Sequence, residues 1–422
     1  MLILKRDSLK DKIKMLLSQG FFHILLGGTL TKVIAFISSI LIVRFVSKED
    51  YAYLTYADNL YSYIYLFACF GLDTAVLKYC INEDKRKNKG YFLFAFRTGM
   101  LIEMILIVII VIAINIFPVA FEQSRAYLYA LLLYPTLYFI VCLLQAFMRA
   151  RLKNKEFAYA GIIQTGIVLL VSVSLVFVVS AFSVIIARYC AAVIVIAYCF
   201  YILRDELNTK ETIILTRDNK REFVMFGISL LIANVFSMIM PINEVFLVNN
   251  VIRDTTVTAN YKVASLIPQQ LGFITSAIIT FYFPYFARMV DRKEIWEKSK
   301  NVGLVTGGII SGIVIIGAIL SPVIIRITYG NKYSDINLLM TVLWVVYGIN
   351  AGFRMLPMNI LPAIGYTRFN MVLSIATCVV HFVIDYYLIK SFGVNGAAIA
   401  GAIVYSLTGF AYWAYLRSKL KR

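Results

Sequence analysis

The clearest chemistry in this sequence comes from ionisable side chains that lie inside long apolar runs. A lysine or arginine at such a position can hold an anion through charge-assisted hydrogen bonds, whereas an aspartate or glutamate can take up and release a proton. Because a charge inside a bilayer is costly, such residues usually face a bundle interior or a water-filled cavity. Eight cations and five acids have this placement: Lys32, Arg44, Lys78, Arg97, Arg188, Lys262, Arg326 and Arg354, and Asp58, Asp73, Glu103, Glu244 and Asp385.

Lys32, in the stretch TLTKVIAF, is the most informative of these residues. It lies about eleven residues into its apolar run, or roughly 16 Å along a helix, so its ammonium group cannot easily reach either membrane surface. Four other cations lie near the ends of their runs, where long side chains can extend to the headgroups: Arg44, Lys78, Arg97 and Arg326. We therefore expect Lys32 to line a polar cavity.

The elements that must position these side chains are membrane-spanning helices. The sequence is 61% hydrophobic and only 15% charged, with a mean hydropathy of +0.80, whereas about a quarter of the residues of a soluble protein are charged. Its apolar runs are long enough to cross a ~30 Å hydrocarbon core as helices, and they lack the alternating pattern of a membrane β-barrel. The predicted fold class is an all-α polytopic membrane protein.

Twelve spans are predicted, and the basic residues indicate their orientation. Of the 41 lysines and arginines, 28 lie in seven alternate segments that include both termini, five lie in the opposite segments and eight lie within spans. Because cytoplasmic loops carry the excess of basic residues, both termini are predicted to be cytoplasmic. The predicted spans are 21–46, 53–79, 91–117, 127–148, 157–178, 183–203, 222–249, 257–286, 301–327, 336–361, 367–389 and 396–416.

The domain organisation follows from the loop that divides these spans into two sets of six. Because six spans return the chain to the side of the membrane on which it started, both halves begin on the same side. This predicts two parallel six-helix lobes around a central cavity. The predicted parts are a cytoplasmic amphipathic segment (1–20), an N-lobe (21–204), a cytoplasmic loop (205–221), a C-lobe (222–416) and a basic cytoplasmic tail (417–422).

Several stretches carry a resemblance to a known family. They are LIVRFVSKEDYAYLTYADNLYSYI (41–64), FGLDTAVLKY (70–79), VNNVIRDTTVTANYKVASLIPQQL (248–271) and the segment 358–407, which ends GVNGAAIAGAIVYSL. With the length and the predicted topology, the chain resembles the polysaccharide repeat-unit flippases. These are bacterial inner-membrane proteins of the multidrug/oligosaccharidyl-lipid/polysaccharide exporter superfamily.

The resemblance implies that an undecaprenyl-pyrophosphate-linked oligosaccharide moves from the cytoplasmic to the periplasmic leaflet by alternating access around a cationic cavity. A pyrophosphate needs cations, and sugars need amide, hydroxyl and aromatic partners. The expected cargo-binding residues are Lys32, Lys262, Arg354, Asn243, Asn260, Gln269, Tyr61 and Tyr65. Packing or interfacial roles are the alternative for the tyrosines, an ion pair for Arg354, and a structural pair within the bundle for Glu103 and Asp385.

The energy source is expected to be an ion gradient or downstream pull, because the sequence has no G-x-x-x-x-G-K-[ST] loop for ATP. The resemblance implies an acidic residue in the outward half of the seventh span, which is often aspartate in many members of the family; the matching residue here is the longer Glu244. This residue, with Asp58 and Asp73, is the candidate for coupling to protons or Na⁺. Neither a cofactor nor a metal is expected, since the six cysteines form no paired motif and His23 and His381 are far apart.

Partners and alternatives complete the prediction. The expected partners are the lipid-linked oligosaccharide, the bilayer and downstream polymerase or ligase machinery, and not nucleic acid, because the net charge of +18 is concentrated in short loops. A multidrug exporter of the same superfamily is the first alternative. A lipid II flippase usually has two further helices, and a membrane glycosyltransferase or polymerase commonly has a large outer loop, so both are less favoured.

Overall fold

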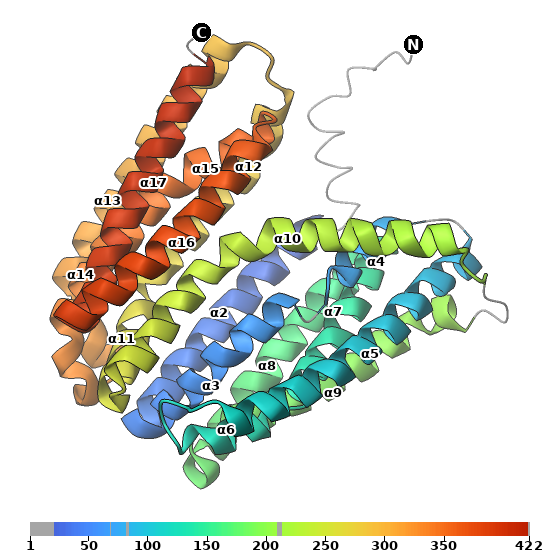
Figure 1. Cartoon of the computed structure of the whole chain (residues 1–422), viewed down its shortest axis with the longest axis horizontal. Helices are drawn as coiled ribbons and strands as arrows, with labels where there is room; N and C mark the ends of the chain where they lie inside the picture. Colours follow the sequence, from blue (N-terminus) through green and yellow to red (C-terminus); the bar gives the residue numbers. More distant parts are fainter. Residues whose placement is uncertain (1–20, 68, 82–83, 209–212, 421–422) are drawn as a thin grey trace. The chain divides into compact units, whose positions relative to one another are not determined.

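The computed structural model describes residues 21–67, 69–81, 84–208 and 213–420, which form helices joined by short turns, with no β-strand among them (Figure 1). Apolar runs become helices because lipid offers no hydrogen-bond partner to the backbone, and a helix satisfies its own N–H and C=O groups. The predicted amphipathic segment 1–20 lies outside the described residues.

The first half of the chain contains eight described helices, which follow the first six predicted spans. The second predicted span is divided into two helices, α3 and α4, and the fourth is bent by 42° between α6 and α7. The helices are α2 (Phe21–Phe45), α3 (Lys48–Phe67), α4 (Leu72–Tyr79), α5 (Lys85–Ile116), α6 (Ser124–Ala130), α7 (Tyr134–Ala150), α8 (Asn154–Val179) and α9 (Phe182–Leu207).

The helices of the second half of the chain are interrupted more often by short non-α-helical segments. Two π-helical segments, η1 and η4, extend its helices, and such segments are frequent at functional sites. The elements are α10 (Arg217–Leu247), η1 (Val248–Ile252), α11 (Thr255–Leu266), η2 (Pro268–Gln270), α12 (Leu271–Arg288), α13 (Arg292–Thr328), η3 (Asn331–Ile336), α14 (Asn337–Ile349), η4 (Asn350–Arg354), α15 (Met355–Ala363), α16 (Thr367–Phe392) and α17 (Val394–Leu420).

The helices confirm the predicted fold class. Among the described residues, nine helices are long and apolar enough to cross a membrane, or ten if the bent pair α6 and α7 counts as one span. The protein is therefore an all-α, multi-pass membrane protein. The number of twelve spans is compatible with these helices and stays a prediction, as does the orientation of the termini.

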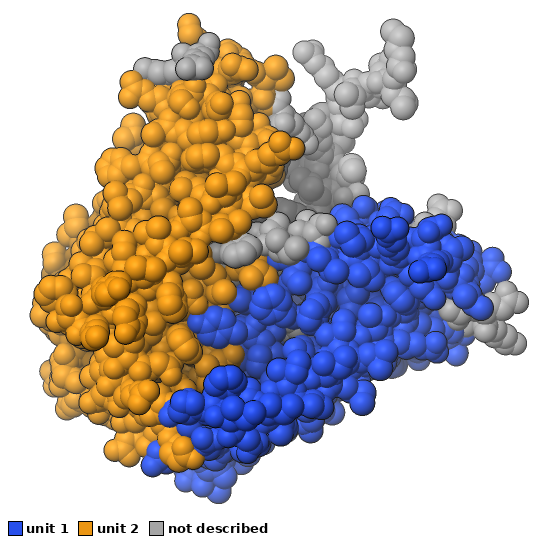
Figure 2. All heavy atoms as spheres, in the orientation of Figure 1, with its two compact units in different colours: residues 1–47, 61–119, 123–232 blue, residues 48–60, 120–122, 233–422 orange. Residues whose placement is uncertain are grey.

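The chain forms two compact units, shown in different colours in Figure 2. Unit 1 comprises residues 1–47, 61–119 and 123–232, and unit 2 comprises residues 48–60, 120–122 and 233–422. The divisions fall inside α3 and inside α10. The lobe boundaries predicted at 204 and 222 stay a prediction.

Unit 1 is held together partly by a close approach of two backbones. Gly71, at the start of α4, has a φ of 72°, which side-chain-bearing residues rarely adopt, and a Cβ there would collide with the carbonyl of Gly227 on α10. Nearby, the ring of Tyr79 lies 5.4 Å from that of Tyr91 and 5.5 Å from that of Phe223. These contacts join α4, α5 and the first part of α10.

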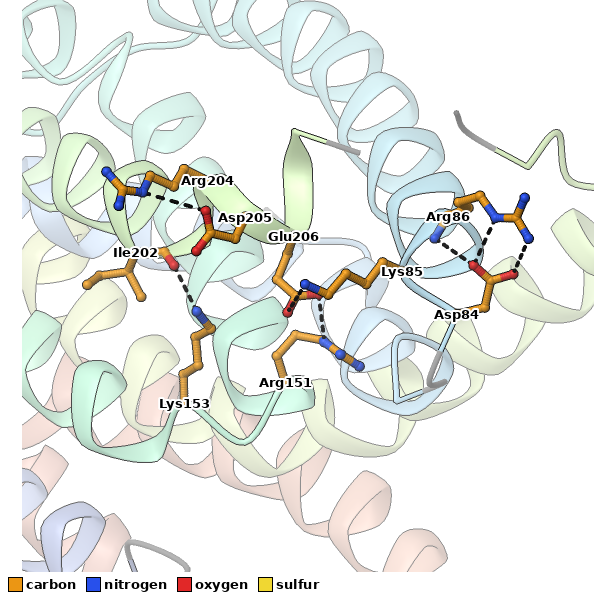
Figure 3. Close-up of polar contacts among 9 residues, drawn as sticks. All are labelled: Asp84, Lys85, Arg86, Arg151, Lys153, Ile202, Arg204, Asp205 and Glu206. Atoms are coloured by element: carbon orange, nitrogen blue, oxygen red, sulfur yellow. Dashed lines mark hydrogen bonds and ion pairs between the residues drawn. The ribbon is translucent and has the colours of Figure 1, made fainter. Parts of the chain in front are cut away.

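One end of unit 1 gathers three loops that the sequence assigns to the same side of the membrane (Figure 3). Glu206, at the end of α9, lies 3.6 Å from Lys85 Nζ and 3.1 Å from Arg151 Nε. Asp84 caps α5 by accepting from the Arg86 N–H, and the Arg86 side chain beside it holds the pKa of that carboxyl below its usual range. The contacts among segments 80–90, 149–156 and 204–221 agree with their predicted common side.

Unit 2 has an apolar core at one end and a polar cluster among its loops. Phe286, Ile295, Leu361 and Tyr412 belong to a buried cluster that joins α12, α13, α15 and α17. Asp335 lies 3.2 Å from Lys48 Nζ, and its carboxylate also accepts from Asn260 at 2.6 Å. Lys48 and Asp335 lie in turns assigned to the outer side, and Asn260 lies one turn or so inside the next span. These contacts bring three outer ends of unit 2 together.

Candidate functional site

A buried carboxylate on α10 accepts a hydrogen bond from the next helix of unit 2. Glu244 is only 3% exposed, and its carboxylate accepts from the hydroxyl of Tyr261 on α11. Tyr261 is itself 1% exposed. Pro241 lies one turn before Glu244 and interrupts the helical hydrogen bonding of α10. The sequence therefore places this acid beside a local irregularity in a membrane helix.

A second acid is contributed by α16. His381 and Asp385 are four residues apart, so they occupy the same face of the helix. Nδ1 of His381 lies 2.9 Å from a carboxylate oxygen of Asp385, and both side chains are almost fully buried. The imidazole also stacks on the ring of Tyr405 on α17, with centroids 6.0 Å apart and an interplanar angle of 17°. The neighbouring helix α17 thus fixes the orientation of the imidazole.

A cation completes this group of side chains. Arg354, in the π-helical segment η4, has its guanidinium 5.4 Å from the centre of the Tyr405 ring, a distance suited to a cation–π contact. It also donates to the amide oxygen of Asn350 at 3.0 Å, one turn earlier. Arg354 is 8% exposed. A buried guanidinium is normally compensated by such contacts and by nearby negative charge.

We name these six residues the Glu244 cluster. They come from α10, α11, η4, α16 and α17, and Glu244 interacts electrostatically with both His381 and Asp385. The members are Glu244, Tyr261, Arg354, His381, Asp385 and Tyr405.

Further charged side chains surround the Glu244 cluster. Lys262 on α11 interacts with Glu244 and with Asp58 of α3. The cluster and its neighbours thus bring together three acidic side chains (Glu244, Asp385 and Asp58), two basic ones (Arg354 and Lys262) and the imidazole of His381. Chains of Asp, Glu and His within membranes are typical proton relays.

The other predicted cargo-binding residues of unit 2 have two kinds of surroundings. Gln269 donates to the hydroxyl of Tyr347 at 2.8 Å, and Asn243 has its amide 3.8 Å from Cys378 Sγ. Lys262 is half-buried. Asn260 instead contacts Asp335 among the loops. Gln269, Asn243 and Lys262 therefore lie in the interior of unit 2, whereas Asn260 belongs to a contact at its end.

The predicted residues of unit 1 have different surroundings. Lys32 is exposed on α2, whereas Tyr61 is 1% exposed and donates to the Leu128 carbonyl at 2.7 Å. Tyr65 packs with its ring centre 5.1 Å from that of Tyr138. Asp73 is half-buried on α4. Tyr61 and Tyr65 thus have the contacts of packing residues, which was the alternative considered for them, and Lys32 remains accessible.

Four of the six members of the Glu244 cluster are not among the site residues that the sequence predicts. His381 is considered only as a metal ligand, Asp385 is an ionisable side chain for which a structural pair is the alternative, and Tyr261 and Tyr405 are not singled out. The available signal was the spacing in HFVID, which puts an imidazole and a carboxylate on one face of an apolar helix. In the part of the chain that the structure describes, no group of three or more His, Cys, Asp or Glu side chains could hold a metal ion.

Comparison with known proteins gives two matches in sequence. The sequence model of a family described as "Polysaccharide biosynthesis protein" matches residues 17–290. A Shigella flexneri protein named "Putative O-antigen transporter" is 27% identical over 230 residues, which are 54% of this chain and 54% of that protein. The chain thus matches about half the length of this curated relative.

Solved structures share the fold over nearly the whole chain. The inward-facing conformation of a multidrug resistance MATE family transporter of the MOP superfamily covers 94% of this chain and 98% of its own, with a TM-score of 0.76 and 12% identity. Lipid II flippase MurJ, in an inward closed conformation, covers 94% of this chain and 87% of its own, with a TM-score of 0.72 and 14% identity. At such low identity, the likeness shows the fold alone.

Proposed function

The chain belongs to the polysaccharide biosynthesis protein family and is a multi-pass membrane transport protein, and from this we propose that it is a flippase for a lipid-linked oligosaccharide. Its cargo is an undecaprenyl-pyrophosphate-linked repeat unit, moved from the cytoplasmic to the outer leaflet of the bacterial inner membrane. The name of the Shigella flexneri relative, an O-antigen transporter, supports this class of cargo.

The cations within the helices support an anionic cargo. Lys32 is exposed on a helix that is apolar over most of its length, and Lys262 is half-buried in unit 2. The lipid tail of the cargo can stay in the bilayer, so only its pyrophosphate and sugars need a polar route. We assign Lys32 to the pyrophosphate, because an ammonium group is a mobile point charge with three donors.

The Glu244 cluster is the observation that carries the coupling mechanism. Two carboxyl groups, an imidazole, two phenols and a guanidinium are buried together, and uptake of one proton makes their net charge more positive by one. The residues of the cluster come from α10, α11, η4, α16 and α17. A change of charge at the cluster therefore affects the packing between these elements of unit 2. We propose that proton binding and release at this cluster biases the protein between its inward-open and outward-open states.

Deletion of the gene tests the proposed function. The deletion strain is expected to accumulate a lipid-linked oligosaccharide on the cytoplasmic leaflet, measured by extraction and mass spectrometry, and to lose its surface polysaccharide. The wild-type gene should restore export, as should a control with the exposed Glu294 replaced, Glu294→Gln. An unchanged pool of lipid-linked intermediate, together with a new sensitivity to cationic drugs, would instead assign the chain to drug export.

A further inference from the structure

Unit 2 contains a groove of about 920 Å³ that the proposed mechanism does not use. It lies between α13, the α14–η4 region and α17, and none of the lining residues belongs to the Glu244 cluster. On α13 the lining runs from Lys300 to Ile315, a length of roughly 22 Å along a helix. The groove therefore follows most of the depth of a ~30 Å hydrocarbon core.

Glycines leave the floor of this groove open. A Cβ built at Gly308 would meet nothing within 4 Å, and one built at Gly307 would meet only the Gly352 carbonyl, at 3.8 Å. Small residues on membrane helices usually let another helix approach closely, as Gly303 does for Trp413, whose ring would lie 2.8 Å from an added Cβ. At Gly307 and Gly308 no described helix of unit 2 fills the space beside the backbone, so this space is open to a ligand.

One end of the groove differs from the rest. Lys300 lies there with its Nζ 5.7 Å from the Trp296 ring and 2.8 Å from a carboxylate oxygen of Glu297, an exposed partner that a phosphate would replace. The rings of Trp296 and Trp413 are 6.3 Å apart. Trp413 also donates to the Phe353 carbonyl at 2.9 Å, which fixes its ring beside the groove. Tryptophan and lysine are typical of the membrane–water interface. The remaining lining is almost wholly apolar, and it includes Leu304, Val314, Ile315, Val345 and Ile349.

This arrangement matches a single long apolar chain with one anionic end. Segment 287–300, which leads into the groove, contains five basic and three acidic residues, and the sequence assigns it to the cytoplasmic side. Because lipid tails are as apolar as the groove, an apolar chain gains little by leaving the bilayer. Selective binding must therefore come from close packing on the glycine floor and from the cation at the end.

We propose that this groove binds the isoprenoid chain of the lipid carrier, and that Lys300 contacts the carrier's phosphate during loading, before the pyrophosphate reaches Lys32. The proposal rests on the proposed function, since it concerns the tail of the same cargo. It assigns the tail a fixed path on the surface of unit 2 while the sugar-bearing head takes a polar route. Loading from the cytoplasmic leaflet then begins at the end of the groove that carries Lys300 and the two tryptophans.

Photocrosslinking of the purified full-length protein tests the apolar part of this site. The probe is a polyprenyl phosphate with a benzophenone group in its chain, and labelled peptides are identified by mass spectrometry. Wild type should be labelled on α13 and α17. Gly308→Leu, which fills the groove, should lower that labelling by about fivefold, whereas Gly312→Leu should not, because Gly312 is equally open but does not line the groove.

The anionic end is tested with the same probe. Lys300→Gln should weaken labelling by polyprenyl phosphate about threefold and leave labelling by the matching polyprenol unchanged. Lys298→Gln is the control, since Lys298 lies two residues away outside the groove and faces the Tyr282 ring. Dioleoyl phosphatidic acid should compete poorly, because its two chains do not fit a single track.

Two outcomes overturn the proposal: labelling spread evenly over exposed apolar helices such as α5 and α8, or equal competition by phosphatidic acid. Either result would mean that the groove holds bulk lipid only. Since the assay does not depend on transport, it separates the two proposals. If the deletion strain accumulates its intermediate while the groove remains unlabelled, only the groove assignment fails.

Discussion

Each unit contains a buried glutamate, and the two glutamates differ in the side chains around them. Glu103, on α5 of unit 1, is 0% exposed, and neither of its carboxylate oxygens has a hydrogen-bond partner among the residues that the structure describes. Glu244, on α10 of unit 2, is 3% exposed and accepts from Tyr261. It also interacts with His381 and Asp385 on α16. Both acids lie on helices, and both are removed from water.

The difference between them lies in their partners rather than in their burial. Glu103 interacts with the thiol of Cys69, which in turn interacts with Asp73 and Cys142. Glu244 has a phenol, an imidazole and a lysine around it. A coupling site needs groups that can pass a proton on and that respond to its arrival. This comparison supports our proposal that coupling to the gradient takes place in unit 2.

The largest effect is expected from Glu244→Gln. The amide keeps the shape of the side chain and can still meet Tyr261, but it cannot carry the charge that a proton neutralises. We expect export to fall by at least about tenfold, which corresponds to about 1.4 kcal/mol in the barrier, and to become insensitive to a protonophore. The measurement is polymer export in the complemented deletion strain, and normal gradient-dependent export by this variant would remove the coupling role.

A smaller loss is expected from Asp385→Asn. His381 would lose the charged partner that lies 2.9 Å away, while its stacking on Tyr405 is kept. Loss of this charge contact is expected to cost about 1 kcal/mol, which corresponds to about fivefold in rate. Export should fall by that factor with unchanged protein abundance. The double variant with Glu244→Gln should be no worse than Glu244→Gln alone, and additive losses would show that the two acids act independently.

Two glycines with positive φ, one in each unit, allow the packing of the units to be compared by substitution. Gly71→Ala in unit 1 combines backbone strain of about 1–3 kcal/mol with overpacking of about 1–3 kcal/mol against Gly227. Gly330→Ala in unit 2 has the strain alone, because a Cβ there meets nothing within 4 Å. Thermal unfolding in detergent should therefore show a larger drop in Tm for Gly71→Ala. Equal drops would contradict the close backbone approach in unit 1.

The smallest effect is expected from Glu103→Gln. Because neither carboxylate oxygen has a hydrogen-bond partner in the described chain, an uncharged amide of the same size should change export by less than about twofold, or about 0.4 kcal/mol. Its response to a protonophore should match that of wild type. A loss of gradient dependence in this variant would move the coupling site from unit 2 to unit 1 and reverse the comparison.

Much of the architecture was predictable because it depends on local patterns. Apolar runs of sufficient length must form helices in lipid, so the all-α, multi-pass fold follows from the composition and the spacing of charges. The quoted stretches 41–64, 70–79 and 248–271 lie within the region 17–290 that matches the family, and the resemblance based on them is confirmed. Glu244 was singled out because a carboxylate is conspicuous in an apolar run.

Only the tertiary structure decided which polar side chains share a site. Tyr61 and Tyr261 have the same chemistry and lie in comparable helices, yet Tyr61 donates to the Leu128 carbonyl, whereas Tyr261 donates to Glu244. The spacing of His381 and Asp385 put them on one face of α16, but nothing local in the sequence says which helix that face meets. The sequence determined the helices and the charges they carry. The packing of α10, α11, α16 and α17 decided which of those side chains lie together, because Glu244 meets His381 and Asp385 only through contacts between residues more than a hundred positions apart.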